Sequence, residues 1–235
     1  MTDGLRRSWR LFAAFRVEQS DPHRFYGLLA RDSAGLISRH QRLAGTTLLD
    51  IGAGPAEFAD TFRAGGARYV ALDYDEDVAS VASGGIVGDA HRLPVGTGTV
   101  DVTFSSNLIE HVQDPATVAD EMVRVTKPGG VVFLSYTNWL SPWGGHEASP
   151  YHWVSGAYAV RRYTRKHGHP PKNQLGKNLF AVSVAWGMRW AGAHPDVEIV
   201  EMRPRYLPRY ARFLLQIPLL REFVTWNLLL ILRRR

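Results

Sequence analysis

Residues 46–57 read TTLLDIGAGPAE, an apolar run that leads into two glycines and then into a helical pattern. Gly52 can adopt backbone angles that other residues avoid, and Gly54 lets a ligand lie against the main chain without meeting a Cβ atom. A dinucleotide-binding turn would carry a third glycine where this chain has Glu57. The stretch predicts a strand, a ligand-binding turn and a helix that begins at Pro55.

The charges around this turn restrict the kind of ligand. Glu57 at the head of the expected helix and Asp50 beside the turn would both repel a phosphate group. The pattern therefore favours a cofactor that is cationic or lacks phosphate. S-adenosylmethionine meets both conditions, because its sulfonium is positively charged and it carries no phosphate. A nicotinamide dinucleotide is the weaker alternative.

Two more acids stand at the ends of apolar segments. Residues 68–73 end in Asp73, about twenty residues after the glycines, which is the spacing of an acid that binds ribose hydroxyls. Tyr74 beside it can offer a flat face to an adenine ring. Residues 85–89 end in Asp89, whose carboxylate can accept a hydrogen bond from the exocyclic amine of adenine. Together these residues indicate an adenosine site.

Six motifs in order resemble those of the class I S-adenosylmethionine-dependent methyltransferases, in particular the small-molecule branch that includes the ubiquinone and menaquinone biosynthesis methyltransferases. The motifs occupy residues 48–54, 71–73, 88–94, 101–107, 110–114 and 124–130. The resemblance implies S-adenosylmethionine as the cofactor and methyl transfer as the activity. It places the following residues at the cofactor site: Asp50, Gly52, Gly54, Asp73, Tyr74, Asp89, Ala90, Ser105, Ser106 and Asn107.

The order of elements predicts an α/β fold of the Rossmann-like, doubly wound kind. Short apolar segments alternate with helical patterns, as in a mainly parallel sheet with crossover helices. We expect seven strands, of which the last is antiparallel, and an insertion after the fifth. The expected strands are 46–51, 68–73, 85–89, 100–106, 130–136, 197–203 and 224–232, and the expected helices are 21–43, 55–64, 115–126, 179–193 and 209–223.

Length and composition fit a single domain over residues 1–235. The chain is 45% hydrophobic, which suffices for one sizeable core. We expect an N-terminal helical segment (1–45), a cofactor-binding core (46–136), a substrate-side insertion (137–178) and the C-terminal part of the sheet (179–235). The absence of cysteine excludes disulfides, thiol nucleophiles and cysteine-bound metals.

Several histidines could serve as a general base, which methyl transfer needs only when the acceptor atom carries a proton. His146 and His152 are the preferred catalytic candidates, because they follow the fifth strand, where the chain should cross the mouth of the pocket. His111 belongs to a family motif and is expected to order the cofactor loop. His167 and His169 flank a turn. No metal site is expected, since these histidines lack acid ligands at a recurring spacing.

The net charge of +6 favours an anionic acceptor. Part of the charge lies in a cluster formed by Arg161, Arg162, Arg165, Lys166, Lys172 and Lys177. Tryptophans at 139, 143 and 153 favour an apolar or aromatic acceptor. We therefore expect a small or amphiphilic molecule, anionic or lipid-linked. An RNA or protein methyltransferase, or a cofactor-binding protein without turnover, are the alternatives, and nucleic acid is less favoured because no RNA-binding module is present.

No segment reads as a signal peptide or a membrane span. Residues 5–16 form a basic amphipathic pattern without a long apolar run, which suits peripheral contact with a membrane. Residues 213–232 are about as long as a span, but they contain Arg221 and Glu222, and a central charge costs about 2.5–3.5 kcal/mol. We expect residence in the cytoplasm and a solvated tail at residues 233–235.

Overall fold

The structure, a computed structural model, describes residues 4–15, 21–76 and 84–235, and its centre is a seven-stranded sheet in the order β3-β2-β1-β4-β5-β7-β6. The strands are β1 (Thr47–Ile51), β2 (Arg68–Asp73), β3 (Ile86–Val87), β4 (Val100–Ser106), β5 (Thr126–Thr137), β6 (Val197–Pro204) and β7 (Asn227–Arg234). Strand β7 runs antiparallel to both of its neighbours, and the other pairs are parallel. The predicted doubly wound α/β fold is confirmed.

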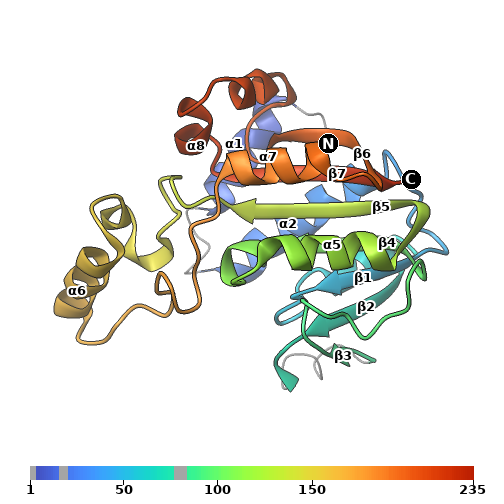
Figure 1. Cartoon of the computed structure of the whole chain (residues 1–235), viewed down its shortest axis with the longest axis horizontal. Helices are drawn as coiled ribbons and strands as arrows, with labels where there is room; N and C mark the ends of the chain where they lie inside the picture. Colours follow the sequence, from blue (N-terminus) through green and yellow to red (C-terminus); the bar gives the residue numbers. More distant parts are fainter. Residues whose placement is uncertain (1–3, 16–20, 77–83) are drawn as a thin grey trace.

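Helices cover both faces of the sheet, with α1 and α2 behind it and α5 and α7 in front in Figure 1. The α-helices are α1 (Leu5–Phe15), α2 (Pro22–Ile37), α3 (Ala59–Ala64), α5 (Pro115–Val125), α6 (Gly156–His167), α7 (Val184–Ala193) and α8 (Leu220–Val224). The 3₁₀ segments are η1 (Ile109–His111), η2 (His146–Ala148), η3 (Tyr151–Trp153) and η4 (Arg209–Gln216). None of the helices in the described part of the chain could cross a membrane.

The two faces of the sheet have separate cores. In β5, Val131 and Phe133 join the core under α1 and α2, while Val132 and Leu134 join the core under α5 and α7. Alternate side chains of a strand point to opposite faces. A strand that is covered on both faces therefore needs the continuous apolar run that β5 shows.

A buried ion pair fastens α1 to α2. The guanidinium of Arg7 donates two hydrogen bonds of 2.6 Å to the carboxylate of Asp32 and a third, of 3.0 Å, to the carbonyl of Arg205. Arg205 itself donates to the hydroxyl of Ser33 in α2 at 2.6 Å. These bonds join α1 and α2 to each other and to the segment that follows β6.

The first helix after β1 differs from its prediction. It begins at Ala59 and not at Pro55. Gly54 and Ala56 have φ angles of 51° and 55°, and this left-handed backbone cannot belong to a right-handed helix. Pro55 therefore lies in a turn, four residues before the helix.

The C-terminal prediction is wrong in two details. The expected helix over 209–223 is divided into η4 and α8, with Pro218 between them, because proline cannot continue a helix. The expected tail is also ordered. Arg233 and Arg234 belong to β7, and their guanidinium groups donate to the carbonyls of Gly129, at 2.8 Å, and Arg124, at 2.7 Å.

The segment between β5 and α7 contains η2, η3 and α6. Figure 1 shows α6 beyond the carboxyl end of β5, away from the body of the sheet. Ser155 caps this helix by accepting a hydrogen bond from the amide of Tyr158, and Gly168 ends it at a φ of 79°. Residues 137–178 thus lie at the edge of the sheet where an α/β protein of this kind binds its ligands.

Candidate functional site

Two cavities open at the carboxyl ends of the strands. The smaller, of about 360 Å³, is lined by Gly52, Leu72, Asp73, Tyr74, Gly88, Asp89, Ala90, His91, Leu108, His111 and Val112. The larger, of about 740 Å³, is lined by Phe15, Pro22, Phe25, Tyr26, Asn107, Glu110, His111, Thr137, Trp143, His146, Glu147, Lys172, Asn173, Asn178 and Tyr206. His111 lines both, so the two cavities adjoin at this side chain.

The smaller cavity brings together the acids that the sequence predicts for an adenosine site. One carboxylate oxygen of Asp73 accepts a hydrogen bond of 2.9 Å from the amide of Gly54, which joins the end of β2 to the glycine turn. Asp89 accepts a bond of 2.9 Å from the amide of His91 and lies 2.7 Å from the ring of the same residue. These bonds hold the pKa of Asp89 below its ordinary value, so its carboxylate is an ionised acceptor at neutral pH.

The glycine turn has the geometry that its sequence predicts. Gly52 has a φ of 72°, and a Cβ atom at this position would lie 2.8 Å from the side chain of Leu108. Gly54 also has a positive φ, but the space around it is open. The first glycine is needed for packing, and the second leaves room for a ligand beside the main chain.

Four residues predicted for the cofactor site line neither cavity: Gly54, which lies in the turn, and Asp50, Ser105 and Ser106, which lie in the sheet. Asp50 is 2% exposed and accepts a 2.6 Å hydrogen bond from the hydroxyl of Tyr69. Burial raises the pKa of Asp50 to about 7. The hydroxyl of Ser105 donates to a carbonyl of β1, and that of Ser106 accepts from Arg205. Because Asp50, Ser105 and Ser106 belong to strands β1 and β4, their side chains form hydrogen bonds inside the fold, next to the turns that follow these strands.

Asn107 lines the larger cavity and not the smaller one. It follows β4 with a φ of 62°, a conformation that asparagine tolerates better than most residues. Its side-chain oxygen accepts a hydrogen bond of 2.8 Å from the amide group of Asn227 at the start of β7. The residue therefore fixes the turn after β4 to the antiparallel strand.

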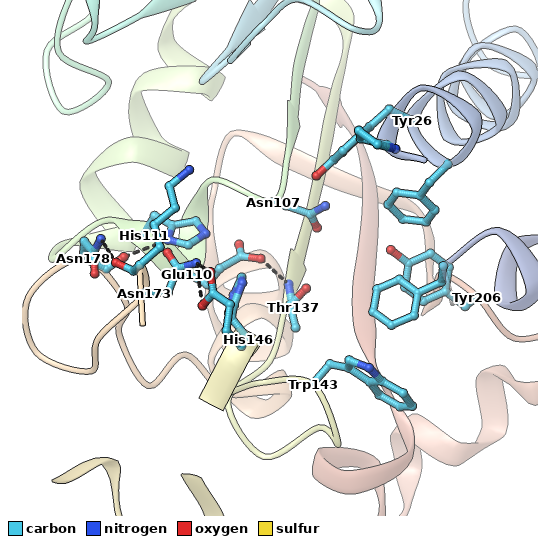
Figure 2. A pocket seen from close by; sticks show the side chains of 15 residues that line it. Tyr26, Asn107, Glu110, His111, Thr137, Trp143, His146, Asn173, Asn178 and Tyr206 are labelled. Carbon is cyan, nitrogen blue, oxygen red and sulfur yellow. Dashed lines mark hydrogen bonds between the residues drawn. The ribbon is translucent and has the colours of Figure 1, made fainter. Parts of the chain in front are cut away.

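The larger cavity has an aromatic side and a polar side, as Figure 2 shows. The aromatic residues are Phe15, Phe25, Tyr26, Trp143 and Tyr206. The polar side carries Glu110, His111 and His146, with Glu147 and Lys172 also in the lining. The aromatic side chains come from α1, α2, the segment after β5 and the segment after β6, and of these residues the sequence analysis connected only Trp143 with the acceptor.

The two preferred histidines have different environments. His146 lines the larger cavity, and burial lowers its pKa to about 4, which leaves the imidazole neutral at neutral pH. His152 is 3% exposed, and its Nε2 atom lies 3.2 Å from the carbonyl of Ser141. The expectation that His152 faces the pocket mouth is wrong, because its ring packs under Gly145, where a Cβ atom would lie 2.5 Å away.

Glu110 is a polar residue of the site that the sequence analysis did not assign to it. It is 1% exposed, and its Oε1 atom accepts a 2.9 Å hydrogen bond from the amide of Thr137. Burial raises the pKa of this carboxyl. The sequence does place Glu110 inside an apolar segment and next to His111. An acid that is only solvated at a helix end has no need of apolar neighbours, so this pattern could have indicated a buried carboxylate.

Comparison with known proteins agrees with the fold and the motifs. A family model described as a methyltransferase domain matches residues 49–134. A protein of Mycobacterium marinum named as an uncharacterized methyltransferase is 46% identical over 245 residues, which cover 98% of this chain and 95% of the relative.

Solved structures share the fold at low sequence identity. An S-adenosylmethionine-dependent methyltransferase from Mesorhizobium loti has a TM-score of 0.59 at 17% identity, covering 87% of this chain and 98% of the other. One from Aquifex aeolicus has a TM-score of 0.54 at 13% identity, covering 94% and 98%. By its close relatives, its motifs and its strand order, the chain belongs to the class I S-adenosylmethionine-dependent methyltransferases.

Proposed function

We propose that the protein transfers a methyl group from S-adenosylmethionine to a small or amphiphilic acceptor in the larger cavity. The observation that carries this proposal is the contact between the two cavities at His111. A donor in the smaller cavity and an acceptor in the larger one would be neighbours there. Holding two reactants in this way can lower a barrier by about 7–11 kcal/mol at the upper range.

The smaller cavity fits the adenosine part of the cofactor. Asp73 would accept hydrogen bonds from the ribose hydroxyls, Asp89 would accept one from the adenine amine, and Tyr74 would cover the base. No lysine or arginine lines this cavity among the residues that the structure describes, which suits a ligand without phosphate. When bound, S-adenosylmethionine supplies a methyl group on a positively charged sulfur.

The larger cavity fits an acceptor with an apolar body and a polar end. Its aromatic side would bury rings or an acyl chain and exclude water from the reacting atoms. The opposite side offers Glu110, His111 and His146 to a polar group. Lys172 in the lining, and the basic residues of α6, would attract an acceptor with a negative charge.

We also propose that the protein takes this acceptor from a membrane surface. Helix α1 presents Leu5 and Trp9, which are 68% and 74% exposed, next to the exposed Arg6 and Arg10. Apolar side chains flanked by arginines on a short helix are typical of binding to anionic lipid surfaces. The same helix ends at Phe15, which lines the larger cavity, so a bound membrane would lie near the acceptor site.

A labelling experiment tests the proposal. Purified protein is incubated with S-adenosylmethionine that carries a tritiated methyl group and with the lipid-soluble, small polar, RNA and protein fractions of a cell extract. We expect label in a lipid-soluble or small-molecule product. Asp73→Ala should abolish it, whereas Asp75→Ala, which removes a neighbouring acid outside both cavities, should not. Label only in RNA or protein would contradict the acceptor class, and no label in any fraction would contradict turnover.

A further inference from the structure

We infer that Glu110, His111 and His146 bind a divalent transition-metal ion of the zinc class in the wall of the larger cavity. One ligand atom of each residue lies within 4.8 Å of those of the other two. Figure 2 shows the three side chains together on the polar side of the cavity. Two imidazoles and one carboxylate, with further positions open to the cavity, form the ligand set of a catalytic zinc site.

Glu110 has a carboxylate oxygen that the protein does not satisfy. Its Oε1 atom accepts the amide hydrogen of Thr137, but Oε2 is buried and has no hydrogen-bond partner among the described residues. A buried, unpartnered carboxylate oxygen is unfavourable, because it has lost its contact with water without replacement. A cation in front of Oε2 would supply the missing partner.

His146 has the same deficiency on the opposite side of the cluster. Its Nε2 atom is buried and makes no hydrogen bond within the described part of the chain. The backbone of His146 has a φ of 49°, which is rare for a residue other than glycine. Its ring meets that of His111 edge to face, with 5.0 Å between the ring centres. The imidazole of His146 therefore lies beside the other histidine of the cluster.

His111 is held in the tautomer that a metal requires. Its Nδ1 atom lies 2.7 Å from the carbonyl oxygen of Asn178, and a carbonyl can only accept, so Nδ1 carries the proton. The Nε2 atom then has a free lone pair. A backbone carbonyl on the second nitrogen is the usual support of a metal-binding histidine. The amide of Phe180 also donates to the carbonyl of Glu110 at 2.8 Å, so one segment fixes both neighbours.

The donor set selects the kind of metal. Two nitrogen ligands and one oxygen ligand suit Zn²⁺ and similar ions better than Mg²⁺, which prefers oxygen ligands. Bonds of about 2.0–2.2 Å need ligand atoms roughly 3–3.6 Å apart, so the cluster would contract slightly on binding. The role of the ion rests on the proposed function: it would hold a hydroxyl oxygen of the acceptor near His111 and promote loss of the hydroxyl proton to water.

Calorimetric titration of metal-free protein with zinc chloride tests the site. We expect one equivalent to bind, and Co²⁺ in its place to give the visible absorption of a low-symmetry site. Glu110→Gln and His146→Asn should each weaken Zn²⁺ binding by roughly 10–100-fold or more. Glutamine can still accept from Thr137, and asparagine tolerates the left-handed backbone, so both variants keep the local structure. The control His169→Asn removes an exposed histidine outside the cavities and should bind Zn²⁺ normally.

The outcomes separate the metal site from the proposed function. Absence of stoichiometric Zn²⁺ binding to the unmodified protein would overturn the inference, and so would equal affinity in Glu110→Gln, His146→Asn and the control. Each protein is also titrated with S-adenosylhomocysteine. Zinc binding that depends on Glu110 and His146 would uphold the metal site even if S-adenosylhomocysteine did not bind, whereas that second result would count against the proposed function alone.

Discussion

Replacement of Asp50 by asparagine should make the protein more stable at alkaline pH. Burial raises the pKa of Asp50 from an ordinary value of 3.8 to about 7, the hydrogen bond from Tyr69 partly opposes this, and the charge of Asp73 adds to it. The folded protein therefore keeps the Asp50 proton to a higher pH than the unfolded chain does. The stability that this proton contributes is fully present below pH 3.8 and is lost as the pH rises to about 7.

The size of the effect follows from the two pKa values of Asp50. The difference between 3.8 and about 7 corresponds to a change of about 4 kcal/mol in the free energy of unfolding across the whole pH range. Between pH 5 and pH 8.5 the loss is about 3 kcal/mol. Asparagine has no proton to lose, and its side-chain oxygen can still accept from Tyr69. Relative to the unmodified protein, the free energy of unfolding of the Asp50→Asn variant should therefore be about 3 kcal/mol more favourable at pH 8.5 than at pH 5.

Urea denaturation followed by circular dichroism at pH 5 and pH 8.5 measures this gain. Other titrating groups are common to both proteins, so their contributions cancel in the comparison. Tyr69→Phe serves as a second variant. It removes the hydrogen bond that lowers the pKa of Asp50, so the loss of stability should extend to a higher pH than in the unmodified protein. An equal pH dependence in Asp50→Asn and the unmodified protein would refute a buried, protonated Asp50.

Three further changes test other parts of the structure. Asp32→Asn should lower the free energy of unfolding in urea by about 3–5 kcal/mol, because it removes the negative charge that faces the buried guanidinium of Arg7. Gly52→Ala should lower the affinity for S-adenosylhomocysteine, measured by calorimetry, because the new Cβ would push Leu108 into the smaller cavity. Trp9→Glu should reduce flotation with anionic vesicles at low salt, since it removes an exposed aromatic side chain from α1.

The first two changes have matched control variants, and the unmodified protein is the control for the third. Asp60→Asn alters an exposed acid and should leave the free energy of unfolding unchanged. A similar loss of stability in this variant would show that the effect of Asp32→Asn does not come from the buried ion pair. Gly176→Ala places a methyl group at another position with a positive φ, in open space outside the smaller cavity. The affinity of this variant for S-adenosylhomocysteine should be unchanged. Failure of the unmodified protein to float with anionic vesicles would contradict the proposed membrane contact.

The site residues that could be predicted from the sequence are those whose position follows from the strand or turn to which they belong. Asp73 is the last residue of β2 and Asp89 follows β3, and parallel strands end at one edge of a sheet, so their convergence follows from topology. Gly52 and Gly54 lie in one turn directly after β1. For such residues a strand assignment is enough to place the side chain.

Other residues depend on contacts between distant segments. The side chain of Asp50 does not line the ligand cavity; it accepts a hydrogen bond from the hydroxyl of Tyr69, which lies on the neighbouring strand. His146 and His152 lie in one irregular segment, and only its folding decides that the first faces the cavity and the second packs inside. Glu110 reaches the same cluster from the segment after β4. No periodic pattern in the sequence encodes these placements.

Binding of the cofactor is the decisive measurement. Purified protein is titrated calorimetrically with S-adenosylmethionine, S-adenosylhomocysteine and NAD, and the titrations are repeated with Asp73→Ala. The arrangement of Asp73 and Asp89 around the smaller cavity leads us to expect micromolar binding of both sulfur compounds, its loss in the variant and no binding of NAD. If neither sulfur compound bound, or if Asp73→Ala bound them as well as the unmodified protein, the assignment of the smaller cavity as the methyl-donor site would be wrong.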